Sequence, residues 1–126
     1  MLQKFFTLLF FISLNALAVT PAELLVGYTS QAGQPADAVR GEAFFKASHG
    51  QEWQCTSCHG KSPMVGGRHA STDKVIEPLA PAANSKRFTD SAKVEKWFRR
   101  NCKDVLAREC TATEKANVLA WLISVR

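Results

Sequence analysis

The sequence has few methionines and few long apolar runs. Two methionines occur in 126 residues, and only Met64 lies beyond the first position. Outside the N-terminus no second apolar segment is long enough to cross a membrane, which excludes a protein with several membrane spans. No internal repeat and no low-complexity tail occur, so a repeat architecture is excluded as well. A chain of this length is about the size of one domain.

The first 18 residues have the pattern of a secretory signal peptide. A short positive start is followed by an almost unbroken apolar run, Phe5–Ala16, and a small-x-small site ends the pattern at Ala18. The run is too short to span a bilayer comfortably. We expect cleavage after Ala18 and export to the periplasm, with an uncleaved membrane anchor as the alternative. Residues 19–36 would then be an N-terminal helix and linker, and residues 37–126 the main domain.

Two cysteines are followed directly by a histidine in the pentapeptide Cys55-Thr56-Ser57-Cys58-His59. This C-x-x-C-H pattern is the attachment signal for c-type haem. The two thiols lie on one turn and can add to the two vinyl groups along one edge of a porphyrin. The imidazole that follows can ligate the iron. We therefore expect one covalent haem c, held by Cys55 and Cys58, with His59 as the proximal axial ligand.

Three other interpretations of this motif are weaker. A thioredoxin-like redox pair needs a βαβ pattern, which is not visible here. A zinc site needs two further ligands, but the remaining cysteines, Cys102 and Cys110, have the wrong spacing for a second knuckle. The third interpretation is two structural cysteines followed by a histidine by chance. The export signal favours haem over this, because c-type haem is usually attached outside the cytoplasm.

Cys102 and Cys110 form an even pair in an oxidising compartment, which predicts a disulfide between them. The bond would close a loop of about nine residues and contribute roughly 2–3 kcal/mol on the chain-entropy estimate. Two free thiols are the alternative.

Periodicity and capping residues predict an all-α fold. The expected helices cover Pro21–Tyr28, Ala38–Ser48, Ser91–Asn101 and the segment from Thr111 to the C-terminus. Residues 60–88 have no clear period and are expected to wrap the haem edge. Gly41 lies inside the second helix, where a glycine costs about 1 kcal/mol of helix stability. We therefore expect Gly41 to be there because it allows the close approach of Trp121. Helix, haem motif, loops, helix, helix is the order of a class I cytochrome c, a small helical domain around one covalent haem.

The group at the sixth position of the iron decides the function. Met64 lies five residues after His59, which is too near to reach the opposite haem face readily. His69 lies in the loop and would give a carrier with two histidine ligands. Asn84 and Asn101 are neutral amides, which bind ferric iron weakly and ferrous iron more weakly still. Of these, Asn101 is better placed, because it shares a helical face with two aromatic residues; alternatively it caps its own helix end.

Two further stretches carry a family resemblance. They are Pro78-Leu79-Ala80-Pro81-Ala82-Ala83-Asn84 and Trp97-Phe98-Arg99-Arg100-Asn101-Cys102, the latter with a second cysteine eight residues on. Together with the haem motif they resemble the SHP-type cytochromes c (sphaeroides haem protein), over roughly residue 40 to the C-terminus. The resemblance implies a class I-like fold and Asn101 as a ferric ligand that leaves on reduction, so that oxygen or nitric oxide can bind. It also implies reduction by a dihaem cytochrome c.

The formal net charge is +5, and removal of the signal takes away only Lys4. The charges are scattered, and the densest run is Arg99 and Arg100 with Lys96 and Lys103. We interpret the charge as solvation plus docking to an acidic redox partner, without nucleic-acid binding and without stable membrane insertion after signal cleavage.

Three functions follow from these observations. The favoured one is a periplasmic monohaem cytochrome that accepts an electron and binds a diatomic ligand at ferrous iron. The alternative is a plain electron carrier with two strong axial ligands, of which His69 would be the second. An enzyme that reduces oxygen, peroxide or a nitrogen oxide is the third, but the arginines and histidines form no recognisable catalytic arrangement.

Overall fold

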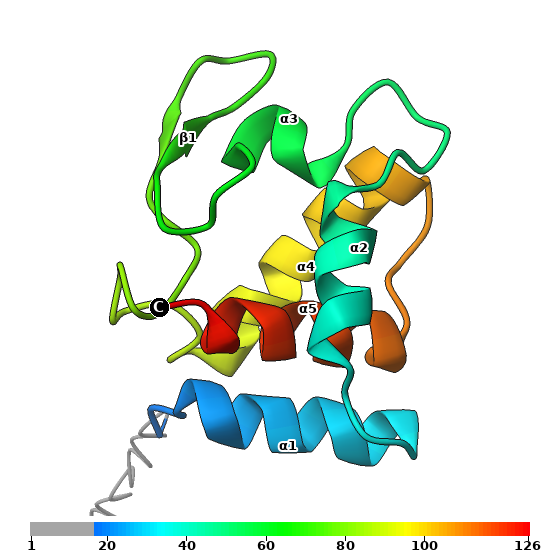
Figure 1. Cartoon of the computed structure of the whole chain (residues 1–126), viewed down its shortest axis with the longest axis vertical. Helices are drawn as coiled ribbons and strands as arrows, with labels where there is room; N and C mark the ends of the chain where they lie inside the picture. The colour runs from blue at the N-terminus through cyan, green and yellow to red at the C-terminus, as the bar shows by residue number, and fades with distance from the viewer. Residues whose placement is uncertain (1–16) are drawn as a thin grey trace, which may run out of the picture.

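The computed structural model describes residues 17–126, so the signal peptide predicted over residues 1–18 lies almost wholly outside the described residues. The elements are α1 (Pro21–Ala32), α2 (Ala38–Lys46), α3 (Cys55–His59), β1 (Gly67–Arg68), β2 (Val75–Ile76), α4 (Ser91–Leu106) and α5 (Ala112–Ser124). In Figure 1, α1 lies beneath α5, and α3 with β1 lies at the opposite end of the molecule. The predicted all-α class is confirmed. None of the helices in the described range combines the length and hydropathy that a membrane crossing needs.

Helix α1 is longer than the predicted Pro21–Tyr28. It begins with a capping box, in which the Thr20 hydroxyl accepts the Glu23 N–H and the Glu23 carboxylate accepts the Thr20 N–H. It ends only at Gly33, whose φ of 67° supplies the left-handed cap. Part of the segment expected to be a linker is therefore helical.

Helix α2 begins where Asp37 predicts it, because the Asp37 side chain accepts the Arg40 N–H. Gly41 allows a close helix contact, but the partner differs from the expected Trp121. A Cβ at Gly41 would collide with the backbone carbonyl of Asn117 in α5. The Trp121 ring instead packs on Phe45, with 5.1 Å between ring centroids.

Helices α4 and α5 differ in how well the sequence marks their ends. The capping box of Thr111 and Glu114 starts α5 as predicted. Helix α4, however, continues past Asn101 to Leu106 and ends at Ala107 in the left-handed conformation. Asn101 therefore lies inside the helix, and the interpretation of it as a helix-end cap is wrong.

The core lies between α5 and the two helices that cross it. One buried cluster joins α2 and α5 and consists of Phe45, Val118, Trp121 and Leu122. A second joins α1 and α5 through Tyr28, Ala116 and Leu119. Phe88 contacts both clusters, and this packing holds it at a φ of 61°, an uncommon conformation for a non-glycine residue.

A polar network ties α4 to the other two long helices. The Tyr28 hydroxyl donates to the Glu95 carboxylate at 2.5 Å, and the Lys115 ammonium donates to its other oxygen at 2.8 Å. The edge of the Phe98 ring meets the Tyr28 ring, with 5.8 Å between centroids. Through these contacts α4 is fixed against α1 and α5 along the side that faces the core.

The segment 60–88 is more ordered than the expected loop. It contains the antiparallel pair β1 and β2, in which Gly67 faces Ile76. Further along, the Pro63 carbonyl accepts the N–H groups of Leu79 and Ala80, and Ala80 is completely buried.

Candidate haem site

Helix α3 is one turn that carries the whole C-x-x-C-H motif. It spans Cys55–His59, and Gly60, at a φ of 70°, turns the chain away after it. Cys55 and Cys58 are half-buried, and neither takes part in a disulfide. Burial raises the pKa of the Cys55 thiol to about 11. A reactive redox cysteine has a lowered thiol pKa, so the environment of Cys55 disfavours the thioredoxin-like alternative.

The β1–β2 hairpin packs directly on this turn. The Ala70 N–H donates to the Cys58 sulfur at 3.2 Å. A Cβ at Gly67 would collide with the Cys58 carbonyl, so a glycine is needed where β1 passes α3. These contacts span roughly ten residues of sequence, and neither residue stood out in the sequence as part of the site.

His59 is prepared as a neutral imidazole. Burial, with a smaller contribution from the positive charge of Arg87, lowers the pKa of His59 to about 4. The neutral ring is the form that ligates a metal ion. The Arg87 side chain is itself held by the carbonyls of Pro78 and Glu77, at 2.8 and 2.6 Å. Arg87 is thus a charged neighbour of His59, and no local sequence pattern marks it as one.

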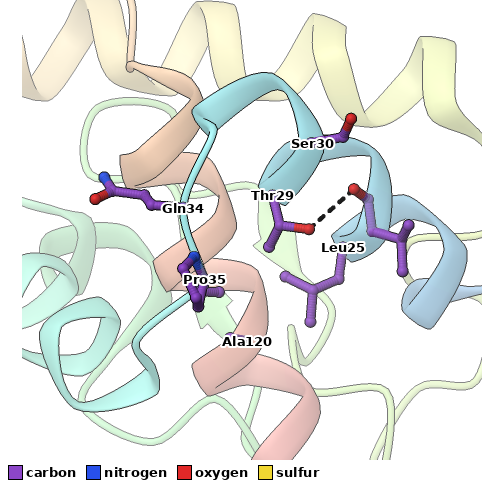
Figure 2. Close-up of a pocket in the computed structure, with 8 residues that line it drawn as sticks. Leu25, Thr29, Ser30, Gln34, Pro35 and Ala120 are labelled. Atoms are coloured by element: carbon purple, nitrogen blue, oxygen red, sulfur yellow. Dashed lines mark hydrogen bonds between the residues drawn. The ribbon is translucent and has the colours of Figure 1, made fainter.

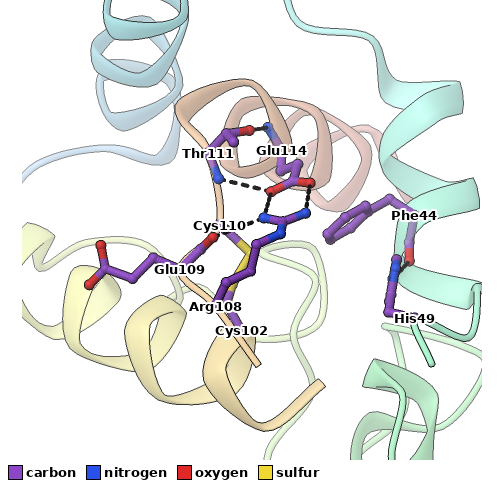
Figure 3. Close-up of polar contacts among 8 residues, drawn as sticks. All are labelled: Phe44, His49, Cys102, Arg108, Glu109, Cys110, Thr111 and Glu114. Atoms are coloured by element: carbon purple, nitrogen blue, oxygen red, sulfur yellow. Dashed lines mark hydrogen bonds and ion pairs between the residues drawn. A yellow bond between two sulfur atoms is a disulfide. The ribbon is translucent and has the colours of Figure 1, made fainter. Parts of the chain in front are cut away.

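The predicted disulfide between Cys102 and Cys110 is present, with 5.6 Å between the Cα atoms. Figure 3 shows it beside the bidentate ion pair of Arg108 with Glu114, at 2.7 and 2.9 Å. Glu114 also accepts the Thr111 N–H at 2.8 Å. The turn between α4 and α5 is therefore fixed covalently and by charge-assisted hydrogen bonds.

This disulfide also removes the zinc alternative, because its two sulfurs are bonded to each other. Within residues 17–126, moreover, no three His, Cys, Asp or Glu side chains converge as a set of metal ligands.

Asn101 lies on a face of α4 that is only partly covered. The residue is half-buried, and its side chain forms no hydrogen bond with any other residue in the described range. Trp97, one turn earlier, leaves 44% of its surface exposed. The buried residues of α4 are instead Cys102 and Val105. The expectation that Asn101 points to the interior is therefore only partly right. The Asn101 amide and the Trp97 indole lie at the edge of the core, each partly exposed.

The two remaining histidines have local partners. The His69 Nδ1 atom accepts the N–H groups of Ser71 and Thr72, both at 3.3 Å, and thereby shapes the β1–β2 turn. His49 Nε2 bonds to the Phe44 carbonyl at 2.9 Å, at the end of α2. Each ring also contacts an aromatic neighbour, His49 with Phe44 and His69 with Trp53, so both are held by local contacts.

A surface hollow of about 630 Å³ lies far from these residues in the fold. Leu25, Thr29 and Ser30 of α1, Gln34 and Pro35 after it, and Ala120 of α5 line it, as Figure 2 shows. It shares no residue with α3 or α4.

The residues of α3 and α4 fit a covalent haem. Two thiols lie on one helical turn, and a neutral imidazole follows them. On α4, the Asn101 amide has no hydrogen-bond partner among residues 17–126 and lies one turn after the exposed Trp97.

Comparison with known proteins assigns the family. The family model of a domain of unknown function, DUF1924, matches residues 31–122. The cytochrome c-type protein SHP of Cereibacter sphaeroides is 50% identical over 107 residues, which cover 82% of each chain. The chain belongs to the SHP-type cytochromes c.

Solved structures agree with this assignment. The structure of oxidised SHP, described as an oxygen-binding cytochrome c, matches this chain with a TM-score of 0.80 and 49% identity. The match covers 85% of this chain and 98% of the SHP chain. Oxidised cytochrome c'' of Methylophilus methylotrophus matches with a TM-score of 0.74 and 37% identity, over 84% and 94% of the two chains. This SHP-type cytochrome thus has the class I-like helical fold and carries one covalent haem c.

Proposed function

We propose that this SHP-type cytochrome c accepts an electron in the periplasm and binds oxygen or nitric oxide at its ferrous haem, from which Asn101 has withdrawn. The observation that carries the proposal is the Asn101 side chain, which is half-buried on α4 without a hydrogen-bond partner in the described chain. No buried side-chain nitrogen or oxygen of the described residues lacks a hydrogen-bond partner, so the Asn101 amide reaches solvent and is not held by any neighbouring residue. An amide that is accessible and not held by its neighbours can ligate an iron and can also leave it. The related SHP protein is described as oxygen-binding, which supports the same activity here.

In this proposal the residues of α3 hold the cofactor. Cys55 and Cys58 form the two thioether bonds, and His59 is the proximal ligand. The low pKa of His59 keeps its imidazole neutral throughout the physiological range. When bound, the haem supplies one-electron redox chemistry and a coordination position for a small ligand.

Asn101 is the displaceable group on the distal side. The helix that carries it is anchored on both sides of Asn101, by Phe98 in the core and by the Cys102–Cys110 disulfide. We infer that the amide leaves by rotation of its side chain while the α4 backbone stays in place. A solution structure of cytochrome c'' is described in terms of haem-ligand detachment, which supports a labile ligand in this family.

The substitution Asn101→Ala tests the proposal, with Asn84→Ala as the matched control. Asn84 is the other candidate amide and is also half-buried, but its side chain accepts the Lys86 N–H at 3.2 Å. We expect Asn101→Ala to give a high-spin ferric spectrum and Asn84→Ala to leave the spectrum unchanged. The reduced wild-type protein should take up carbon monoxide rapidly. An Asn101→Ala spectrum identical to wild type would refute the assignment.

The alternative function, an electron carrier with His69 as a second strong ligand, makes the opposite prediction. His69→Ala would then shift the spectrum and the reduction potential, and the reduced protein would be low-spin and indifferent to carbon monoxide. The contacts of His69 favour our proposal, because two backbone N–H groups of its own turn already hold the ring.

The electron donor that the family resemblance implies is a dihaem cytochrome c. We propose such a protein as the partner, with export to the periplasm by the segment 1–18 bringing the two into one compartment.

A further inference from the structure

Four cations form a row along the outer face of α4. Lys93, Lys96, Arg100 and Lys103 are three, four and three residues apart, so they share one side of the helix. All four are exposed. We call this row the α4 cationic stripe; at 1.5 Å per residue it is about 15 Å long.

The stripe differs from the other cations of these helices in having no acidic partner. Arg99 lies 3.6 Å from Glu109, and Lys115 lies 2.8 Å from Glu95. Within the described chain, none of the four stripe residues forms a salt bridge. One acid, Asp104, lies four residues after Arg100 on the same side of the helix, which still leaves four cations against one acid there.

Unpaired like charges at such spacings weaken a helix slightly. Arg100 contacts the Trp97 ring, and Lys103 lies in the last turn, where a cation favours the helix dipole. The side chains of Lys93 and Lys96 have no such contact in the described chain, because the helix is held from its opposite side by Phe98, Cys102 and Val105. A row of exposed charge does, however, produce a field that steers an oppositely charged partner.

The stripe also borders the part of α4 that carries the proposed ligand. Arg100 directly precedes Asn101, and its guanidinium lies over the Trp97 ring, 5.2 Å from the ring centroid. A partner that contacts the stripe would therefore lie next to Trp97, and Asn101 follows one turn later on the Trp97 side of the helix.

We propose that the α4 cationic stripe is the docking surface for the acidic face of an electron-donor protein. The inference rests on the proposed function, in which Asn101 marks the distal face of the haem. It names the surface at which the electron enters the protein. The net charge of the whole chain does not identify such a surface. Encounters between redox proteins use small interfaces and depend on charge complementarity for their rate, and a single helical row of cations suits such an interface.

An anionic membrane is the competing partner, and the packing of α4 disfavours it. Helices that lie in a membrane surface insert an apolar face between the lipids. Most of the apolar face of α4 is already occupied, since Phe98 packs against Tyr28 and Val105 is buried. One exposed ring, Trp97, is left beside the stripe, and the Arg100 guanidinium lies over it, so α4 does not present the wide apolar face that insertion between lipids needs.

The test compares two double variants of the haem-loaded protein that lose the same charge. Lys93→Gln with Lys96→Gln removes half of the stripe while keeping away from Asn101. Its control is Lys61→Gln with Lys74→Gln, which removes two lysines from outside α4; both are exposed, and neither forms a salt bridge within the described residues. Reduction of the ferric protein is followed by stopped flow with reduced flavodoxin, an acidic flavoprotein, and separately with reduced riboflavin.

We expect the stripe variant to react with flavodoxin at least about threefold more slowly than the control variant at roughly 10 mM ionic strength, where charges act over about 30 Å. The difference should vanish near 1 M salt, and riboflavin should reduce all proteins equally. Equal losses in the two variants would show that only net charge matters and would overturn the proposal. So would unchanged flavodoxin rates in a stripe variant that no longer sediments with phosphatidylglycerol vesicles.

Carbon monoxide binding separates this inference from the proposed function. If the reduced protein ignores carbon monoxide but keeps the stripe-specific rate loss, the ligand-binding function fails and the docking surface stands. If carbon monoxide binds normally and the rate loss is absent, the docking surface fails alone.

Discussion

Replacement of Gly41 by alanine should destabilise the protein, although alanine is the better helix former. The Cβ of an alanine at this position would collide with the carbonyl group of Asn117 and the amide nitrogen of Val118. Both atoms belong to the backbone of α5, which cannot move aside as a flexible side chain could. Helix α2 must therefore shift away from α5. That shift also stretches the 2.7 Å hydrogen bond from the Asp37 N–H to the buried Asn117 side chain.

The size of the effect follows from two opposing contributions. Inserting an atom into a well-packed interface costs about 1–3 kcal/mol, and a backbone collision belongs at the upper end of this range. The higher helix propensity of alanine returns about 1 kcal/mol. The net loss in the free energy of unfolding is then roughly 2 kcal/mol, or about 8 °C in melting temperature for a domain of this size.

Gly27→Ala is the matched control. Gly27 lies in the interior of α1, and an added Cβ would have no atom within 4 Å. This variant should gain about 0.5–1 kcal/mol from helix propensity alone. Urea unfolding of the haem-loaded variants, followed by far-UV circular dichroism, measures both changes. If Gly41→Ala is as stable as wild type, or if both variants shift in the same direction, the close contact of α2 with α5 does not limit stability.

Two further predictions concern the contacts that hold α4. Burial raises the pKa of Glu95, but hydrogen bonds from Lys115 and Tyr28 outweigh burial and leave the pKa below its usual value. The stability gained from this carboxylate is full above the unfolded-state pKa and is lost as pH falls through the lower folded-state pKa. Glu95→Gln should therefore flatten the drop in melting temperature below about pH 5. An equally steep drop in the variant would contradict the role of Glu95. Cys102→Ala with Cys110→Ala should cost about 2–3 kcal/mol in urea unfolding, because the open turn regains chain entropy. Addition of a reductant should then lower the stability of the wild type but leave the double variant unchanged, and sensitivity of both would point to another cause.

Features that depend on a few consecutive residues were predicted well. The helix starts at Asp37 and at Thr111 with Glu114 are present, since each cap is a hydrogen bond between residues three apart. The pairing of Cys102 with Cys110 was also correct, because only one even pair remained after the haem motif. The end of α4 was placed too early, because Ala107 ends it and alanine carries no stop signal.

Features that depend on packing were predicted in kind but not in detail. Gly41 was expected to allow a close helix contact, yet its partner is the backbone of Asn117 rather than Trp121. Arg87 next to His59 and the hairpin on Cys58 were not anticipated at all. No local pattern marks such residues, since each acts on a group at least nine positions away in the chain.

The sequence by itself determined the chemistry available to this protein: two thiols and an imidazole on one turn, an even pair of cysteines, and the caps that start its helices. These depend on residue type and short spacing, which are fixed before the chain folds. The tertiary structure decided the surroundings of that chemistry. It set the neutral state of His59, left the Asn101 amide without a hydrogen-bond partner among the described residues and exposed the cations of α4 on one side. Burial and charge separation of this kind arise only when distant segments pack together.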